Sequence, residues 1–394
     1  MKQKQINETS WKEVELGDKN YFEIIGSGIK KFEGIKDFLS TKCIKYDKIK
    51  KIECQISFNE RPSRANMQPQ RDSIWFAKMQ GTIKTYLFSD KNPEEIKKYI
   101  LSTGFSGIRT NNLIYPKYLQ FYFLTKEFNK NKDVECIGGT QKAINNSKIA
   151  KLKISLPFTL EGKPDITKQK QIATILENAK KLKDKNKIII EDLDEYLKSV
   201  FYEMFLKGNK FQGIELGNEE YFEIVMGQSP PGNSYNEKRA GVPFFQGKKE
   251  FGEKYPTIIK WTDNPTKMSK PKDILMSVRA PVGSVNIGNV DCCIGRGLCA
   301  IRCKDKIKLD FVYDYFKIHE KEISNLGQGS TFKAITTKQL KEIKIPLPPL
   351  PLQEKFSSIV EQVEKTKEKL KQNENALGEL FNSLMQKAFR GELI

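Results

Sequence analysis

The feature that most constrains this chain is a proline-rich stretch followed by a long helical pattern, and it occurs twice. Ile345-Pro346-Leu347-Pro348-Pro349-Leu350-Pro351 is extended, because proline fixes φ, lacks a backbone donor and restricts the residue before it. A helical pattern follows from Leu352 to about Arg390. The stretch 154–160 similarly precedes a helical pattern from about Thr167 to Lys207. Each stretch is therefore predicted to end a globular domain and to begin a long helix.

Matching segments show that the repeat extends beyond these two joints. The corresponding pairs are Val14–Gly26 with Ile214–Val225, Thr140–Ile144 with Thr331–Ile335, and Ile149–Pro157 with Leu340–Pro348. The chain is therefore predicted to contain two units, each with a globular domain of roughly 140 residues and a helix of roughly 40. The predicted boundaries are a tail at 1–10, a first domain at 11–157, a linker and helix at 158–208, a second domain at 209–347 and a helix at 348–394.

The interiors of the two globular domains hardly match each other. Short apolar segments broken by Gly, Pro and Asn predict a small mixed α/β or mostly β domain in each. The predicted strands are Ile52–Phe58, Ser73–Phe76, Thr82–Phe88, Ile274–Val278, Ser284–Ile287 and Leu298–Arg302. An aromatic-rich helical segment comes late in each domain, at Pro116–Phe128 and Leu309–Ile323. A repeated frame with divergent interiors indicates one scaffold that carries two different recognition surfaces.

The two long helices carry an apolar heptad pattern, which is typical of a coiled coil. Apolar residues recur at a and d, and the adjacent e positions add further ones. The predicted central seam consists of Leu182, Asn186, Ile189, Leu193, Leu370, Asn373 and Leu377. Pairing Asn186 with Asn373 in antiparallel helices places the other layers in register, since a buried polar pair can fix register. The predicted fold is α+β: two small mixed domains separated by a long antiparallel two-helix coiled coil, with a pseudo-two-fold repeat. The alternative is that each helix packs on its own domain.

The charge of the chain indicates a polyanionic partner. The formal net charge is +19, and the two helical segments, with nine Lys against seven acidic residues and seven basic against six, contribute only +3. The remainder lies mostly on the globular domains, which indicates binding to nucleic acid or to an anionic membrane surface. A proteome rich in lysine is the alternative cause. No apolar segment is long enough to span a bilayer, and no secretory signal is recognisable at the amino terminus. The seven Cys show no disulfide spacing, so we expect reduced thiols in a cytoplasmic protein.

The residue patterns of catalysis are missing. An adenine methyltransferase needs an Asn/Asp-Pro-Pro-aromatic loop, and Asn264-Pro265-Thr266 is only a turn. The phosphate-binding Gly-x4-Gly-Lys-Ser/Thr loop is also missing. His319, the single histidine, is assigned to surface or packing, and the cluster from Cys292 to Cys303 to structural thiols on strands, because no Cys-x2-Cys pair indicates zinc. We therefore expect this chain to be non-catalytic by itself and to bind no metal.

Four segments resemble type I restriction–modification specificity subunits. They are Pro346–Phe356 before a coiled-coil helix, the ending Leu384–Leu393, Gly227-Gln-Ser-Pro-Pro-Gly232 and Ile294-Gly-Arg-Gly297. The likeness covers nearly the whole chain. The first domain departs from it, since Gly26-Ser-Gly-Ile-Lys30 lacks the Ser-Pro-Pro element. It resembles a different class of target recognition domain.

The resemblance implies that each domain recognises one half of a split, asymmetric double-stranded DNA sequence. The helices would set the gap between the halves and dock two adenine-N6 methyltransferase subunits, with a restriction/motor subunit joining for cleavage. S-adenosylmethionine would then belong to the methyltransferase, ATP and Mg²⁺ to the restriction subunit, and no cofactor to this chain. The alternatives are a stand-alone DNA methyltransferase or nuclease with unrecognised motifs, and a coiled-coil adaptor that binds nucleic acid non-specifically.

Residues that would contact DNA are chosen as basic and polar side chains in loops, because Lys and Arg contact phosphates while Arg, Asn, Gln and Ser recognise base edges. In the second domain the candidates are Gln228, Ser229, Asn233, Tyr235, Lys248, Lys249, Arg279 and Arg296. In the first domain they are Arg61, Arg64, Gln68, Gln70, Arg71, Lys78, Arg109 and Asn111. Val278-Arg279-Ala280 has a predicted counterpart in Ser63-Arg64-Ala65.

Overall fold

The computed structural model describes residues 10–208, 211–327 and 334–394. It divides into two compact units: residues up to 185 with 373–394, and residues 186–372. Both long helices are therefore shared between the units. Three stretches that carried predictions lie outside the described residues: 1–9 of the predicted tail, 209–210 at the predicted start of the second domain, and 331–333 of the second Thr–Ile segment.

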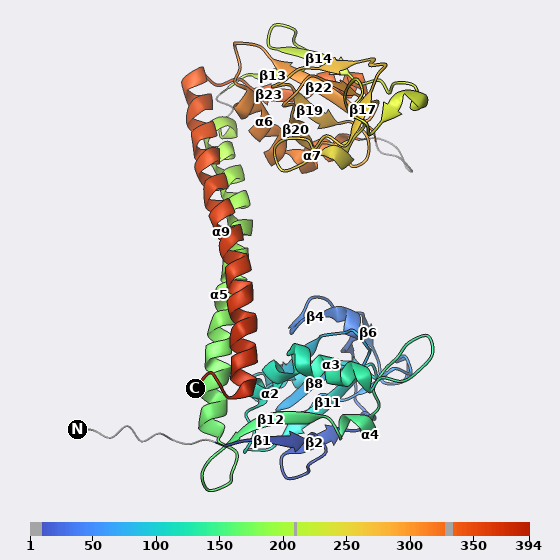
Figure 1. The fold of residues 1–394 in the computed structure, drawn as a ribbon, viewed down its shortest axis with the longest axis vertical. Helices are drawn as coiled ribbons and strands as arrows, with labels where there is room; N and C mark the ends of the chain where they lie inside the picture. Colours follow the sequence, from blue (N-terminus) through green and yellow to red (C-terminus); the bar gives the residue numbers. More distant parts are fainter. Residues whose placement is uncertain (1–9, 209–210, 328–333) are drawn as a thin grey trace, which may run out of the picture. The chain divides into compact units, whose positions relative to one another are not determined.

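The first unit is built around an antiparallel sheet in the order β2 (Phe22–Ile25), β11 (Phe105–Thr110), β8 (Ser73–Ala77) and β9 (Thr85–Phe88) (Figure 1). Successive side chains of a strand point to opposite faces. Ile74 and Phe76 accordingly pack into a core with the helices, while Trp75 and Ala77 pack into a separate core. Because both faces of β8 are covered, all five of its residues are buried.

A second sheet and several small elements complete the first unit. The sheet has the order β6 (Cys54–Ile56), β3 (Lys36–Leu39), β10 (Tyr99–Ser102) and β7 (Ala65–Met67), with β3 and β10 parallel. The remaining elements are β1 (Ser10–Glu15) paired with β12 (Lys153–Phe158), the hairpin β4 (Ile44–Lys45) and β5 (Lys48–Ile49), and the helices α1 (Pro93–Lys98), α2 (Pro116–Phe123), α3 (Lys126–Val134), α4 (Asn146–Ile149) and the first part of α5 (Ile166–Phe201).

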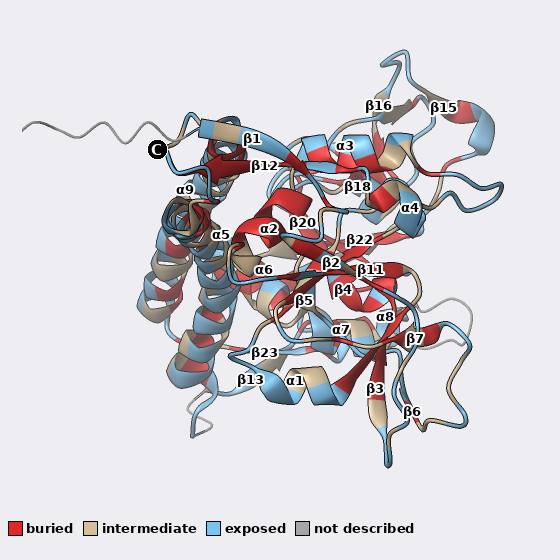
Figure 2. Cartoon of the chain, turned by 90° about the horizontal axis from the view of Figure 1, so that it is seen from below, coloured by how far each residue is buried: buried red, intermediate tan, exposed pale blue. Residues whose placement is uncertain are grey.

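The second unit repeats this plan. Its central sheet has the order β14 (Phe222–Met226), β22 (Leu298–Cys303), β19 (Ile274–Ser277) and β20 (Val285–Ile287). A five-stranded sheet of the same unit has the spatial order β15 (Tyr235–Asn236), β17 (Lys260–Thr262), β16 (Val242–Phe245), β21 (Cys292–Ile294) and β18 (Met268–Ser269). The other elements are β13 (Gly213–Glu215) paired with β23 (Lys344–Pro346), and the helices α6 (Leu309–Ile318), α7 (Glu320–Leu326), α8 (Thr337–Lys341) and most of α9 (Leu350–Arg390). Figure 2 colours as buried the central strands β11 and β22 of the corresponding four-stranded sheets of the two units.

The two central sheets correspond strand by strand, although their sequences barely match. The amide of Lys78 donates to Gly104 O at 2.9 Å, and that of Val278 donates to Gly297 O at 2.9 Å. Beyond these residues, Met79 forms a bridge with Ala143, and Arg279 forms one with Ala334. Arg279 therefore corresponds to Met79, and the predicted correspondence with Arg64 is wrong. The predicted α+β fold with two mixed domains, an internal repeat and long coiled-coil helices is confirmed.

Several predicted elements need correction at their ends. The segments predicted as strands at 73–76, 274–278 and 298–302 are β8, β19 and β22. The two late segments predicted as single helices are each broken in two. Thr125 interrupts the first because its hydroxyl accepts a hydrogen bond from Phe128 N at 3.1 Å and so caps α3. His319 lies between α6 and α7, where it stacks on Tyr315 with ring centroids 4.4 Å apart, which confirms its assignment to surface or packing.

A buried glutamine joins each long helix to its globular domain. The Gln169 side chain on α5 accepts a hydrogen bond from Tyr115 N at 2.8 Å and donates to Leu113 O at 3.3 Å. The Gln353 side chain on α9 accepts one from Lys308 N at 2.8 Å and donates to Pro348 O at 2.8 Å. Both glutamines are fully buried. Each accepts a hydrogen bond from the N-cap residue of a helix in its domain, α2 in the first unit and α6 in the second. The two joints are thus built alike.

The helices pack antiparallel in the second unit. Asn186 Nδ2 donates to Leu370 O at 2.7 Å, Lys367 Nζ lies 2.5 Å from Asp194 Oδ1, and the rings of Phe201 and Phe356 are 5.3 Å apart. Later residues of α5 therefore contact earlier residues of α9, as in an antiparallel pair. In the first unit, the early residues of α5 share a core with the last turns of α9 in the same way.

The predicted seam needs correction at its d positions, whereas Asn186, at an a position, is buried. Leu182 is 56% exposed and Ile189 is 42% exposed, and Asn373 is exposed as well, so their assignment to the seam is wrong. The pairing of Asn186 with Asn373 joins residues of different units and stays a prediction. The inward positions are a and e, which include Leu176 and Lys367. Apolar residues occur at both d and e of α5, so the sequence favours neither stripe clearly. Lys367 sits inside because its ammonium group is held by Asp194 and Glu364 while its apolar stem is covered.

Candidate nucleic-acid interface

Three main-chain segments of the second unit meet at the carboxyl end of β19. Gly227 N donates to Leu298 O at 2.9 Å, Gln228 N to Ile294 O at 2.9 Å, and Gly295 N to Phe245 O at 2.8 Å. A Cβ atom on Gly227 would lie 2.2 Å from Gly295 O, and one on Gly297 would lie 2.5 Å from Gln246 O. Because these neighbours are backbone atoms, only glycine allows the segments to approach so closely.

This packing presents Arg296 to solvent. Arg296 N donates to Ser229 Oγ at 3.2 Å, which fixes the loop, while its side chain is exposed and has no partner within the described residues. Gln228 is also exposed, and its carbonyl accepts from the Thr266 hydroxyl. Ser229 therefore positions the arginine loop, whereas Arg296 and Gln228 have side chains available for a ligand.

Arg279 and two lysines flank the same loop. Val278, the neighbour of Arg279, donates to Gly297 O, and the Arg279 side chain is exposed without a partner in the part of the chain that the structure describes. A pocket of about 460 Å³ lies between the turn that carries Lys248 and Lys249 and the residues that follow Arg279. Lys248 is 3.5 Å from the Glu320 carboxylate. The structure thus gathers the basic candidates Lys248, Lys249, Arg279 and Arg296 around one edge, together with Gln228 and Ser229.

Tyr235 and Asn233 have different roles. The Tyr235 ring stacks on Phe244 with centroids 4.8 Å apart, and its hydroxyl donates to Pro230 O at 2.9 Å. The side chain thus supports the turn at Pro230, and its polar atom is already occupied. Asn233 is exposed on that turn.

In the first unit, the candidate residues divide between the two ends of the central sheet. Arg64 and Lys78 lie at the carboxyl end of β8, since Thr103 N donates to Arg64 O at 2.8 Å and Lys78 N donates to Gly104 O. Arg71 and Arg109 lie at the amino end of β8, where Arg109 is opposite Ser73. Only the carboxyl end corresponds to the edge that carries Arg279 in the second unit.

The arginines of the first unit already have partners. Arg64 forms an ion pair with Glu53, and a hydrogen bond from Ser40 together with Arg64 holds the pKa of Glu53 below its ordinary value. Arg71 Nη2 lies 3.0 Å from Asp90 Oδ2. The Arg61 guanidinium lies 4.2 Å from the ring centroid of Phe58.

Arg109 belongs to a structural pair that occurs twice. It forms an ion pair with Glu23 across β11 and β2, and Arg302 forms one with Glu223 across β22 and β14 at 2.7 Å. Gln70 Oε1 accepts a further hydrogen bond from Arg109 at 3.4 Å. Since the same cross-strand pair is kept in both units, Arg109 is better explained by the scaffold than by a ligand.

The remaining candidates of the first unit are partly used by the fold. The Asn111 amide donates to Asn20 O, and its oxygen accepts from Leu113 N at 3.0 Å, so this side chain builds a turn. Gln68 is half-buried on the segment between β7 and β8. Lys78 is half-buried, and burial lowers the pKa of its ammonium group.

Some residues at these edges were missed by the sequence analysis. Gln246 closes against Gly297 in the second unit, and Lys267 O accepts from Ile294 N at 2.8 Å. In the first unit, Gln80, Lys126 and Lys130 line a pocket. The spacing of Lys126 and Lys130, four residues apart in a helical segment, is the signal that could have identified them.

Within the described ranges, no cluster of three or more His, Cys, Asp or Glu side chains could hold a metal ion. Cys292, Cys293, Cys299 and Cys303 lie on β21 and β22 as free thiols, and burial raises the pKa of Cys299 to about 12. Nor does any described helix combine the length and the apolarity that a membrane span requires.

Comparison with known proteins decides the family. The family model described as the type I restriction modification DNA specificity domain matches residues 9–194 and 217–378. The chain belongs to this family. Its members are the non-catalytic DNA-recognition subunits of restriction–modification complexes, so the expectation that this chain is not itself an enzyme is confirmed, and a stand-alone methyltransferase or nuclease is not favoured.

Relatives of the specificity subunit support this assignment over nearly its whole length. A Methanocaldococcus jannaschii protein named as the specificity subunit of the type I restriction enzyme MjaX is 39% identical over 298 residues, which are 70% of this chain and 68% of that protein. A chain from a structural study of type I restriction–modification complex assembly and conformational transition matches with a TM-score of 0.72 and 28% identity, over 97% of this chain and 98% of that one. The HsdS subunit from Thermoanaerobacter tengcongensis matches with a TM-score of 0.51 and 28% identity, over 97% of both chains.

Proposed function

We propose that each unit binds one half of a split, asymmetric DNA sequence, and that the complex of this chain with its partners methylates adenine only where both halves are present. The observation that carries this proposal is the repeated sheet whose carboxyl edge bears different side chains in the two units. Arg279 and Arg296 are exposed at this edge of the second unit, and neither side chain has a partner among the described residues, so both are available to contact DNA. A shared scaffold with different edge residues suits two different half-sites.

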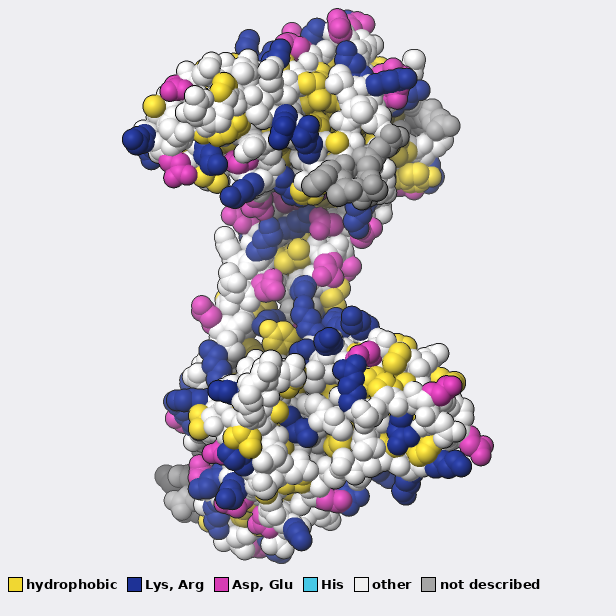
Figure 3. Space-filling view, turned by 90° about the vertical axis from the view of Figure 1, so that its right-hand side faces the viewer, with side chains coloured by type: hydrophobic (Ala, Val, Ile, Leu, Met, Phe, Trp, Pro, Cys, Tyr) yellow, Lys and Arg dark blue, Asp and Glu magenta, His cyan; other side chains and the backbone are white. Residues whose placement is uncertain are grey.

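The candidate residues divide into binding and supporting roles. In the second unit we assign Arg279, Arg296 and Gln228 to base edges and Lys248, Lys249 and Asn233 to phosphates or sugars, with Ser229 and Tyr235 as supports. In the first unit we assign Arg64 and Lys78 to DNA. Gln68, Gln70, Arg61, Arg71, Arg109 and Asn111 are then supporting residues. Basic side chains gather with few acidic neighbours in several places on the face of each unit drawn in Figure 3, which suits a polyanionic ligand.

The outward apolar residues of the long helices support docking of the methyltransferase. Tyr196 is 51% exposed in the second unit, and Leu380 is 49% exposed in the first. They hold equivalent places, twenty-seven residues after the buried glutamines Gln169 and Gln353. Leu182 and Ile189 extend the same outward stripe of α5. Since solvent-exposed apolar stripes mark protein interfaces, we propose that one methyltransferase subunit docks on each.

Cofactors follow from this assignment. S-adenosylmethionine would bind to the methyltransferase subunits, and ATP and Mg²⁺ to a restriction/motor subunit where one accompanies them. The complex would act in the cytoplasm, where its DNA lies.

Expression of this chain with its methyltransferase tests the proposal. Sequencing of host DNA should show N6-methyladenine at a motif of two short halves separated by a fixed gap. Arg296→Ala should change only one half. A continuous motif, or methylation by the methyltransferase alone at the same sites, would refute it.

Lengthening the helices tests the spacing. One heptad inserted into each of α5 and α9 adds about 10 Å of helix. The gap should then grow by about three base pairs, because duplex DNA rises about 3.4 Å per pair. An unchanged gap would show that the helices do not set it.

A further inference from the structure

The carboxyl end of β8 corresponds to the edge of the second unit that carries Arg279, so further side chains that could bind a ligand are expected there. The turn between β8 and β9 packs against α3: Gly81 N donates to Asp133 Oδ2 at 3.1 Å, and Gln80 Nε2 donates to Asp133 O at 3.4 Å. In the second unit the turn between β19 and β20 packs against α7 in the same manner, with Gly283 close to Glu320 O. The helices α3 and α7 therefore hold corresponding places.

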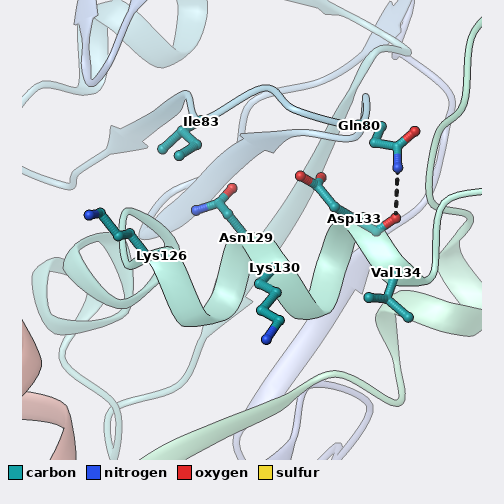
Figure 4. A pocket seen from close by; sticks show the side chains of 7 residues that line it. All are labelled: Gln80, Ile83, Lys126, Asn129, Lys130, Asp133 and Val134. Atoms are coloured by element: carbon teal, nitrogen blue, oxygen red, sulfur yellow. Dashed lines mark hydrogen bonds between the residues drawn. The ribbon is translucent and has the colours of Figure 1, made fainter.

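An open pocket of about 430 Å³ lies between that turn and α3. Figure 4 shows its lining: Gln80 and Ile83 from the turn, and Lys126, Asn129, Lys130, Asp133 and Val134 from α3. Lys126 and Lys130 lie one helical turn apart, and both side chains extend away from the helix (Figure 4). Two lysine side chains of α3 therefore line the pocket.

The charge on this surface is uncompensated. Lys126 and Lys130 are exposed, and neither has an ion-pair partner within the described residues. The Asp133 carboxylate does not neutralise them, because it lies 3.5 Å from the buried Lys132 ammonium and accepts the Gly81 amide. Lys132 is itself saturated by main-chain oxygens, including Thr82 O at 2.7 Å and Met79 O at 3.2 Å. It holds the turn in place and leaves the two outer lysines free.

The corresponding helix of the second unit has the opposite charge. Glu320 begins α7, and its carboxylate contacts the Lys248 ammonium at 3.5 Å and the Ser284 hydroxyl. Basic groups of that unit are carried instead by the loop of Lys248 and Lys249. Each unit thus has basic side chains beside the same end of its sheet, but on a helix in the first and on a loop in the second.

We propose that Lys126 and Lys130, together with Lys78, bind the phosphate backbone of duplex DNA next to the half-site of the first unit. This inference rests on the proposed function, since it takes DNA as the ligand of this edge. The contacts are sequence-independent: they hold the first unit on the duplex, and base recognition falls to neighbouring groups.

The test compares two double variants of the full chain in complex with its methyltransferase. Lys126→Ala with Lys130→Ala removes the proposed contacts, and alanine preserves the helix. Lys19→Ala with Lys91→Ala removes the same charge from exposed positions at the opposite end of the sheet. Lys126→Arg with Lys130→Arg keeps the charge. Binding to a duplex with the methylated motif and to an unrelated duplex is measured from low to moderate salt, with thermal unfolding as the check on folding.

We expect the alanine variant of α3 to bind both duplexes about tenfold more weakly at moderate salt, with a salt slope smaller by about 2, because each phosphate contact contributes about 0.9 to that slope. The arginine variant should bind like the unmodified chain, and so should the Lys19/Lys91 variant. Equal losses in both alanine variants, or no loss in the α3 variant, would overturn the inference while leaving the proposed function intact. Failure of the unmodified complex to prefer its motif would instead count against the proposed function.

Discussion

The first and second units each contain a four-stranded sheet of the same topology, but they present basic side chains differently at its edge. In the second unit, three glycine-containing segments lock together, and Arg279 and Arg296 stand clear of any partner among the described residues. In the first unit, Arg61, Arg64, Arg71 and Arg109 all contact an acidic group or an aromatic ring. Under the proposed function, the arginines of the second unit are ready to contact DNA, whereas Arg64 of the first would have to leave Glu53 first.

Whether an arginine is already paired affects the binding free energy that it can contribute. A free arginine held on a rigid loop loses little conformational freedom on binding, and no existing ion pair must be broken. A paired arginine exchanges one carboxylate for one phosphate or base and gains less. The difference predicts that the second unit contributes more to affinity through arginine, and that the first depends more on lysine.

The largest expected difference concerns two corresponding glycines. Gly297→Ala should lower the free energy of unfolding by about 3 kcal/mol, because its Cβ would lie 2.5 Å from Gln246 O and the backbone cannot yield cheaply. Gly104→Ala should change it by less than about 0.5 kcal/mol, since the closest atom to its Cβ is the Thr41 methyl at 3.4 Å. Denaturant unfolding measures both. Equal losses would mean that the second edge is no more tightly packed than the first.

The two glutamine joints should behave alike. Gln169→Leu and Gln353→Leu each leave a part-buried backbone N–H, of Tyr115 or Lys308, without its acceptor, so each should cost about 2 kcal/mol. The exposed Gln171→Leu is the matched control on α5. Thermal and denaturant unfolding are the measurements. If one joint tolerated the change and the other did not, the structural equivalence of the joints would not extend to their energetics.

Smaller losses are expected from single arginines, and they should differ in kind. Arg296→Ala should weaken binding to the methylated motif by about 1–2 kcal/mol and relax one base position of one half. Arg109→Ala should leave the motif unchanged and lower stability by about 0.5 kcal/mol, because Arg109 pairs with Glu23 across the sheet. Glu23→Ala is the control, because it removes the same ion pair from its other side. If the methylated motif became less specific in the Arg109 variant, Arg109 would have to be counted among the residues that contact DNA.

The sequence predicts the frame of this fold better than its interior, for a physical reason. The joints depend on particular residues such as prolines and buried glutamines, so they remain visible as matching segments. The interior strands need only apolar side chains on their buried faces, so β8 and β19 can hold equivalent positions in the two sheets although their sequences do not match. The strand β10, which pairs with β3 far back in the chain, carries no local signal of that partner.

The candidate site shows the same limit. Arg279 and Arg296 could be chosen because glycines and prolines around them indicate a loop close to a ligand. Arg109 was chosen on residue type alone, although Ile108-Arg109 and Ile301-Arg302 also match, as do Glu23 and Glu223, which indicates a repeated pair. The seam error arose similarly: Lys367 appears too polar for a seam until Asp194 and Glu364 are seen beside it.

The last expected effect separates the units by pH. Burial, with a lesser contribution from Asp310, raises the pKa of Asp314 on α6 to about 8, while the corresponding residue of α2 is the buried Phe121. A carboxyl group that keeps its proton in the folded state stabilises that state at low pH, and this contribution is lost as pH rises from about 4 to about 8, by at most about 1.4 kcal/mol per pH unit. Asp314→Asn, a permanently neutral analogue, should therefore match the unmodified chain near pH 4 and exceed it in unfolding free energy at pH 8. Asp310→Asn should retain most of the slope. Denaturant unfolding from pH 4 to 8 measures this, and a slope that survives in the Asp314 variant would place its origin elsewhere.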